Sequence, residues 1–407
     1  MNQISFVPQH PPPLPSTPLL FSGDRGEFRR LVIRGAGLEL ITVGFYRFWL
    51  ATDIRRHLWS NTDIDGDAAE YTGRGKELLI GFLFALAILV PIYLAYFLVG
   101  LEVERFKAFA SFPLFLFFYL FGQFAIYRAR RYRLTRTVWR GVRFWMDGSG
   151  WAYAGRAALW GLLMIVTLGL ILPWREAALE RYKMRHCHYG DLQGGFAGTG
   201  WEFFKRGWWL WLLMVVLFVG AFAVPLKFGL LLSSKIKTWV VFSWLLILLA
   251  APFIYAVFKA TEWRWWLSGI RFGEVRFESE LRRGALVGLY WKAIGWFLLI
   301  VVSFSGYLFA CASLIAKMSQ LPMAKLFVAG HLQDSIPMLL LGALGYLTLI
   351  LILNVVLRIY LLRDVWARLV ASTTVHHIEA VANVSASGDL ASALGEGLAD
   401  GLDIVGF

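Results

Sequence analysis

Long apolar stretches follow one another in pairs along this chain. Four of them have the length of a membrane span: residues 78–100, 109–127, 208–226 and 239–258. A fifth, residues 286–316, is long enough for a tilted or broken helix, and a sixth covers residues 336–357. About 20 apolar residues cross a bilayer as a helix, because a helix satisfies its backbone groups internally. The pattern therefore predicts a polytopic membrane protein.

Two shorter apolar stretches, residues 38–50 and 157–174, are ambiguous. Residues 128–143 contain seven arginines and no acidic residue, which indicates a cytoplasmic position. If residues 157–174 crossed the bilayer, the basic loop that follows them would face outward. We therefore expect six crossings with two re-entrant or interfacial segments, and both termini in the cytoplasm. Eight crossings is the alternative.

One segment of the sequence occurs twice. Residues 41–77 and 166–202 share seven identities at a single offset, and self-similarity at a fixed spacing is typical of proteins built from copies of one unit. The matched pairs are Thr42 and Thr167, Gly44 and Gly169, Trp49 and Trp174, Arg56 and Arg181, Gly73 and Gly198, Gly75 and Gly200, and Glu77 and Glu202.

A third, more divergent copy starts at Gly269, with its apolar part expanded into two spans. This gives a predicted organisation of five parts. They are a disordered Pro-rich arm (1–20), repeat 1 with a transmembrane pair (21–127), repeat 2 with a transmembrane pair (128–258), repeat 3 with two transmembrane helices (259–384) and a C-terminal tail (385–407).

Alternating segments between the spans predict short strands. In residues 271–278 (RFGEVRFE), Arg271 and Val275 would point to one side and Phe272 and Glu274 to the other. The predicted fold class is an all-α polytopic membrane protein with internal repeats and six to eight transmembrane helices. Short re-entrant or interfacial segments and small cytoplasmic β elements complete it.

Composition supports a membrane protein and disfavours a nucleic-acid partner. Apolar residues make up 58% of the chain and charged residues 16%, below the quarter that is usual in soluble domains. The net charge of +13 comes mostly from arginines at membrane edges, which anionic lipid headgroups explain. Nucleic-acid binding would need these residues on one soluble face. The N-terminus lacks the features of a signal peptide.

Several motifs resemble the DUF898 (YjgN) family. They are Phe21-Ser-Gly23, the run from Thr42 to Trp49, Glu70-Tyr-Thr-Gly73 and the later Gly-Val-Arg-Phe and Pro-Trp pairs, and the resemblance covers roughly residues 20 to 390. It implies a bacterial inner-membrane protein of uncharacterised function and supplies no catalytic residues. The chain departs from the pattern where Phe48-Trp49 replaces a Pro-Trp pair, and near Leu362, where the third Pro-Trp is absent.

Tryptophan and arginine recur together at the expected membrane edge. Seven residues apart on a helix, they share one face. They could form a pocket for a lipid headgroup, or they could simply anchor the helix, with Trp at the interface and Arg reaching to the headgroups. The candidate lipid-headgroup and interface residues are Trp49, Arg56, Arg128, Arg130, Arg131, Arg133, Trp174 and Arg181.

Few polar side chains lie within the apolar stretches, and the candidates for lining a polar cavity are Glu39, Gln123, Lys292 and Asn354. Residues 186–188 (His-Cys-His) lack the second pair of ligands that zinc sites use, so no metal site is expected. No phosphate-binding loop or hydrolase motif occurs, so we expect neither a cofactor nor an enzyme.

Two functions remain for such a protein. The first is a channel or transporter for a small solute or a lipid, because repeats with discontinuous helices can place a binding site between copies. The alternative is a scaffold or assembly protein of the envelope. Expected partners are membrane lipids with anionic headgroups, and a second copy or another membrane protein is possible. A membrane enzyme acting on lipid has no catalytic set behind it.

Overall fold

The computed structural model describes residues 16–102, 107–227, 236–318, 332–388 and 390. Residues 1–15 of the predicted disordered arm lie outside this range. Its last residues do not belong to a disordered arm: strand β1 (Ser16–Pro18) pairs with β12 (Thr373–His376), and β2 (Leu20–Phe21) pairs with β3 (Thr62–Ile64). Most of the predicted C-terminal tail also lies outside, and Ser385 exchanges hydrogen bonds with Asp191.

Two helical hairpins replace the two ambiguous apolar stretches. Residues 38–50 contain the end of α1 (Arg25–Ile41), a turn and the start of α2 (Arg47–Ser60). Residues 157–174 likewise join α5 (Gly150–Val166) to α6 (Leu172–Arg185). Each pair packs side by side, since Phe28 and Leu58 share one buried cluster and Tyr153 stacks on Tyr182. Neither stretch forms a single crossing helix.

Long helices form three pairs. Their bounds are α3 (Gly75–Glu102) with α4 (Lys107–Thr135), α7 (Gly200–Lys227) with α8 (Ile236–Gly269), and α9 (Val287–Met318) with α10 (Leu332–Leu357). The last helix continues through a π-helical stretch (Arg358–Arg363) into α11 (Asp364–Ala371).

Five helices in the described part of the chain are long and apolar enough to cross a membrane. They lie in α3, α7, α8, α9 and the continuous helix of α10 and α11. The predicted span 109–127 is the first part of α4, which is not among the five; its last part is rich in arginine. At most 22% of any of these spans is buried inside the protein, so their apolar faces are left for lipid.

The strands form far more than small β elements. Nine are hydrogen-bonded in the order β1-β12-β11-β10-β9-β8-β7-β6-β5, and three more in the order β2-β3-β4. Every described pairing is antiparallel. The remaining bounds are β4 (Asp67–Ala68), β5 (Glu70–Tyr71), β6 (Thr137–Trp139), β7 (Val142–Met146), β8 (Cys187–Tyr189), β9 (Leu192–Phe196), β10 (Ile270–Phe272) and β11 (Val275–Ser279).

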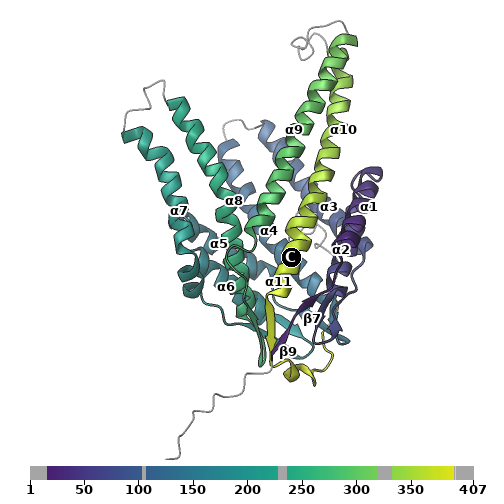
Figure 1. Cartoon of the computed structure of the whole chain (residues 1–407), viewed down its shortest axis with the longest axis vertical. Helices are drawn as coiled ribbons and strands as arrows, with labels where there is room; N and C mark the ends of the chain where they lie inside the picture. The colour runs from purple at the N-terminus through teal and green to yellow at the C-terminus, as the bar shows by residue number, and fades with distance from the viewer. Residues whose placement is uncertain (1–15, 103–106, 228–235, 319–331, 389, 391–407) are drawn as a thin grey trace, which may run out of the picture.

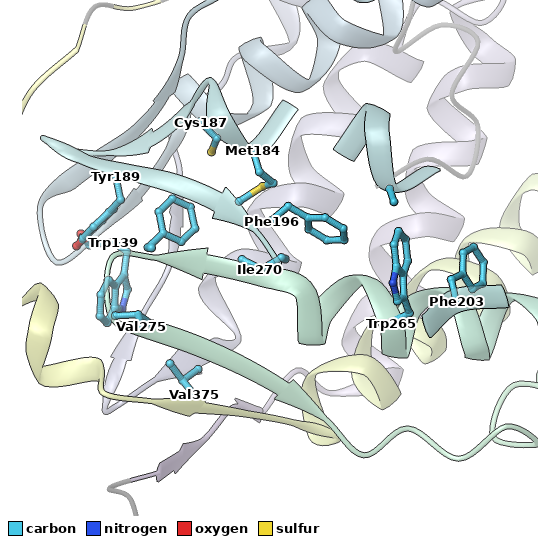
Figure 2. Packing of buried hydrophobic residues seen from close by; sticks show 12 residues of the cluster. Trp139, Met184, Cys187, Tyr189, Phe196, Phe203, Trp265, Ile270, Val275 and Val375 are labelled. Atoms are coloured by element: carbon cyan, nitrogen blue, oxygen red, sulfur yellow. The ribbon is translucent and has the colours of Figure 1, made fainter. Parts of the chain in front are cut away.

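The two sheets join into a closed ring. Only Leu19 separates β1 from β2, and only Ala69 separates β4 from β5, so each of these two chain segments pairs with one sheet and then with the other. Apolar side chains from the strands fill the space between them, among them Trp139, Tyr189, Val275 and Val375 (Figure 2). The expectation of an all-α protein is therefore wrong, because the strands form this ring.

Residues 271–278 form a hairpin rather than one strand. Gly273 has a φ of 56°, and Phe272 pairs with Val275 across the two-residue turn. Both side chains are therefore buried in the ring, whereas a single alternating strand would have placed them on opposite faces. A glycine at positive φ is what such a tight turn requires.

The ring is the base from which the helices project (Figure 1). Strand β5 leads into α3 and α4 returns to β6; β9 leads into α7 and α8 returns to β10; β11 leads into α9 and α11 returns to β12. Because β1 lies beside β12, the first and last strands of the chain meet in the same ring.

Candidate functional site

The turns of the two hairpins have the same geometry. Thr42 Oγ1 donates a hydrogen bond to the carbonyl of Leu38 at 2.7 Å, and Thr167 Oγ1 does so to Leu163 at 2.8 Å. The following residue has a left-handed backbone in both turns, with φ of 51° at Val43 and 50° at Leu168. A glycine at positive φ comes next in each turn.

The tips of the hairpins are apolar and exposed. Ile41 and Val43 are 77% and 83% exposed, and the matched Val166 and Leu168 are 80% and 82% exposed. Side chains of this size gain about 1.5–3 kcal/mol each when they leave water. An apolar environment favours these side chains over water, so each hairpin ends in an apolar surface.

The repeated Trp and Arg residues hold each hairpin to the long helix that follows it. A Cβ atom added to Gly75 would lie 2.7 Å from the Trp49 Cα, and one added to Gly200 would lie 2.8 Å from the Trp174 Cα. The arginines seven positions after these tryptophans donate to backbone carbonyls: Arg56 to Gly73 at 3.4 Å and Arg181 to Gly198 at 3.5 Å.

These contacts give the repeated residues a role that the sequence did not suggest. The repeated Thr, Trp, Arg and three glycines have the same turn geometry or contact in both segments, while Glu77 and Glu202 differ. Glu77 pairs with Arg136 at 2.8 Å, and Glu202 accepts from the Thr199 backbone at 3.5 Å. The signal that could have revealed this role is the spacing itself, which pairs each Trp with a Gly 26 positions later.

We call each hairpin with the long helix after it a hairpin unit: α1, α2 and α3 form the first, and α5, α6 and α7 the second. An aromatic pair packs between α2 and α3 in the first unit and is missing from the second. Phe48 of α2 packs on Phe82 of α3, with ring centroids 5.2 Å apart. The matched positions in the second unit are Pro173 and Gly207. A Cβ atom added to Gly207 would have no heavy atom within 4 Å. The second unit therefore lacks the volume of two rings at this place.

A cavity of about 460 Å³ occupies this part of the second unit. Its wall comes from the turn after α5, the start of α6, and the facing sides of α7 and α8. The lining side chains are almost entirely apolar: Met164, Gly169, Leu170, Leu172, Pro173, Phe203, Phe204, Gly207, Trp208, Leu210, Trp211, Met214, Ala251, Ile254, Tyr255 and Phe258. We call it the α7–α8 cavity.

A second cavity of about 300 Å³ also borders this turn. It is lined by Trp160, Thr167, Leu170, Ile171 and Trp174. Leu170 lines both cavities. The α5–α6 turn therefore contributes to the walls of both cavities.

The four arginines of residues 128–133 that were expected to face lipid headgroups lie on the last part of α4. All four are half-buried, because α4 continues to Thr135 and packs against α5. Arg130 forms an ion pair of 2.9 Å with Glu180 of α6, which also pairs with Lys183. Burial alone would raise the pKa of Glu180, but the charges of Lys183 and Arg130 outweigh it and lower this pKa to about 2.

The polar candidates within the apolar stretches lie on four different helices. Glu39 of α1 is buried and pairs with Arg358 at 3.1 Å. Gln123 of α4 and Asn354 of α10 are half-buried, and Lys292 of α9 is exposed. None of the four lines either of the two cavities described here.

No group of three or more His, Cys, Asp or Glu side chains within the described residues could hold a metal ion. In the His-Cys-His run, His186 contacts Asp147 at 2.7 Å and His188 stacks on Trp145 at 4.1 Å. Cys187 and Cys311 are buried free thiols, and burial raises the pKa of Cys187 to about 11.

The fold and the cavities define a membrane protein with long apolar helices rooted in an antiparallel β ring. Residues 16–401 match the family described as bacterial protein of unknown function, DUF898, and the chain belongs to this family. Searches of curated proteins and of solved structures gave no match.

Proposed function

We propose that the protein binds membrane lipid and handles it in the manner of a transporter, with the second hairpin unit as the place of contact. The observation that carries this proposal is the α7–α8 cavity, which is apolar and lies between two helices of membrane-spanning length. The polar candidates do not meet in either described cavity, which favours lipid over a small polar solute.

The topology of this proposal follows the helix pairs. The three pairs cross the bilayer six times, the two hairpins enter one leaflet, and the β ring lies in the cytoplasm of a bacterium at the inner membrane. Basic side chains near the ring, such as Arg128, Arg133 and Arg206, favour this orientation. The matched turns and Trp–Gly contacts support two copies of one unit, and the α9–α11 segment is a third, extended copy.

Lipid crosslinking tests the proposed function. The protein is purified into nanodiscs that contain a phospholipid with a photoactivatable diazirine in one acyl chain. We expect adducts concentrated on peptides from α6, α7 and α8, well above those on the α9–α10 pair. Adducts spread evenly over all lipid-facing helices would contradict the proposal. A single co-purifying protein with no concentrated adduct would support the scaffold alternative instead.

A further inference from the structure

We infer that the α7–α8 cavity of the second hairpin unit is a binding site for one acyl chain of an anionic phospholipid, at a place that Phe48 and Phe82 occupy in the first unit. This inference rests on the proposed function and makes it specific.

The two units differ in side chains at the place where the cavity lies. In the first unit, Phe48 and Phe82 fill the space between the hairpin and the long helix. In the second unit, Pro173 and Gly207 remove both rings, while the neighbouring contact of Trp174 with Gly200 is kept. The Trp–Gly contact is therefore shared by the two units, and two ring side chains of the first unit are absent from the wall of the cavity in the second.

The wall of the cavity selects an apolar occupant. Trp211 donates its indole N–H to the carbonyl of Leu168 at 3.2 Å, so its polar atom is satisfied and its ring remains as apolar wall. Water needs two to four polar partners to occupy a buried site, and this lining offers few. Since α7 and α8 have the length and composition of membrane spans, the apolar molecule that reaches the cavity is a lipid chain.

The end of the cavity nearest the ring carries an aromatic cluster and a lysine. Phe204 lines the cavity and packs on Trp174 and Trp201, with centroid distances of 5.3 and 5.5 Å. The Lys205 ammonium lies 5.3 Å from the Trp201 ring, on an exposed part of α7. Trp and Lys are typical of the headgroup level of a bilayer. The position matched to Lys205 in the first unit is Ile80.

Filling the cavity tests the acyl-chain site. In Gly207→Phe a ring enters the open space, as Phe82 does in the first unit. We expect at least about a tenfold loss of diazirine adducts on the peptide that spans residues 203–214, because excluding two CH₂ groups already costs that much affinity. Gly220→Phe is the matched control: it is on the same helix, has no heavy atom within 4 Å of the added Cβ, and does not line the cavity.

Different results of these crosslinking experiments would overturn the acyl-chain site and the proposed function. Unchanged adducts on residues 203–214 in Gly207→Phe, or an equal loss in Gly220→Phe, would overturn the acyl-chain site even if adducts elsewhere on α6 and α8 persist. An even spread of adducts in the unmodified protein would overturn the proposed function itself. Both variants are checked for the elution profile and thermal unfolding of the unmodified protein before crosslinking.

A comparison of two photolipids tests whether Lys205 contacts the headgroup. With an anionic photolipid, Lys205→Gln is expected to reduce adducts on residues 203–214 by about fivefold, the effect of one cation near a lipid surface. With a zwitterionic photolipid of the same chains, the adducts should stay the same. Equal loss for both lipids, or no loss for either, would overturn the assignment of Lys205 to the headgroup.

Discussion

Replacing Glu180 by alanine is expected to destabilise the fold by about 3–5 kcal/mol, the usual cost of removing one partner from a buried ion pair. Glu180 is 9% exposed, and its partners Arg130 and Lys183 are 18% and 12% exposed. The substitution would leave both cations without their carboxylate. Thermal and chaotrope unfolding of the purified protein measures the effect.

Glu274→Ala is the control for this prediction. Glu274 is exposed in the turn between β10 and β11, and its removal should change stability by less than about 0.5 kcal/mol. If the two variants had the same free energy of unfolding, the ion pairs of Arg130 and Lys183 with Glu180 would not hold α4 to α6.

The same carboxylate gives a pH dependence with a defined sign. Its folded-state pKa of about 2 is below the ordinary value of 4.5, so the stability it contributes is present above about pH 4.5 and is lost as the pH falls toward 2. The difference in stability between the unmodified protein and Glu180→Gln should therefore be full at pH 7 and smaller at pH 3.

Gly200→Ala is expected to destabilise the protein by about 1–3 kcal/mol, the cost of overpacking a close contact. The added Cβ would lie 2.8 Å from the Cα of Trp174, and a backbone atom cannot rotate away. Gly75→Ala should have the same sign, because its Cβ would lie 2.7 Å from the Cα of Trp49. Unfolding of each variant in detergent, beside the unmodified protein, measures the loss.

Gly207→Ala is the matched control on the same helix. No heavy atom lies within 4 Å of its added Cβ, and alanine favours a helix over glycine by up to about 1 kcal/mol. It should be neutral or stabilising. Equal destabilisation by Gly200→Ala and Gly207→Ala would mean that the Trp174 contact does not determine how α6 meets α7.

The long helices could be predicted from sequence because their signal, an apolar run of membrane length, is local. Residues 38–50 and 157–174 were expected to be re-entrant or interfacial, and the turns at Thr42 and Thr167 within them were not predicted. The β ring could not be predicted as a whole, since its strands have two to five residues and β1 pairs with a strand more than 350 positions away. Its hairpins did leave a signal, in Asp65-Gly66 and Gly190-Asp191.

The candidate site was less accessible to sequence reasoning. The arginines of residues 128–133 were interpreted as interface residues that face lipid headgroups, and the ion pair of Arg130 was not expected because its partner Glu180 is 50 positions away. The sequence showed that Phe48 stands where the second copy has a proline. The consequence of this difference depends on Phe82, which Phe48 contacts only in the folded protein. Gly207 belongs to none of the sequence motifs, and only the open space beside it in the structure marks it as part of the cavity.

The most direct test of the lipid-site account is an experimental structure of the protein in nanodiscs that contain anionic phospholipid. The account predicts elongated density in the α7–α8 cavity, running along α7 past Gly207, with a phosphate near Lys205. A cavity closed by inward movement of Trp208 or Met214, with lipid density no stronger than around α9 and α10, would contradict it.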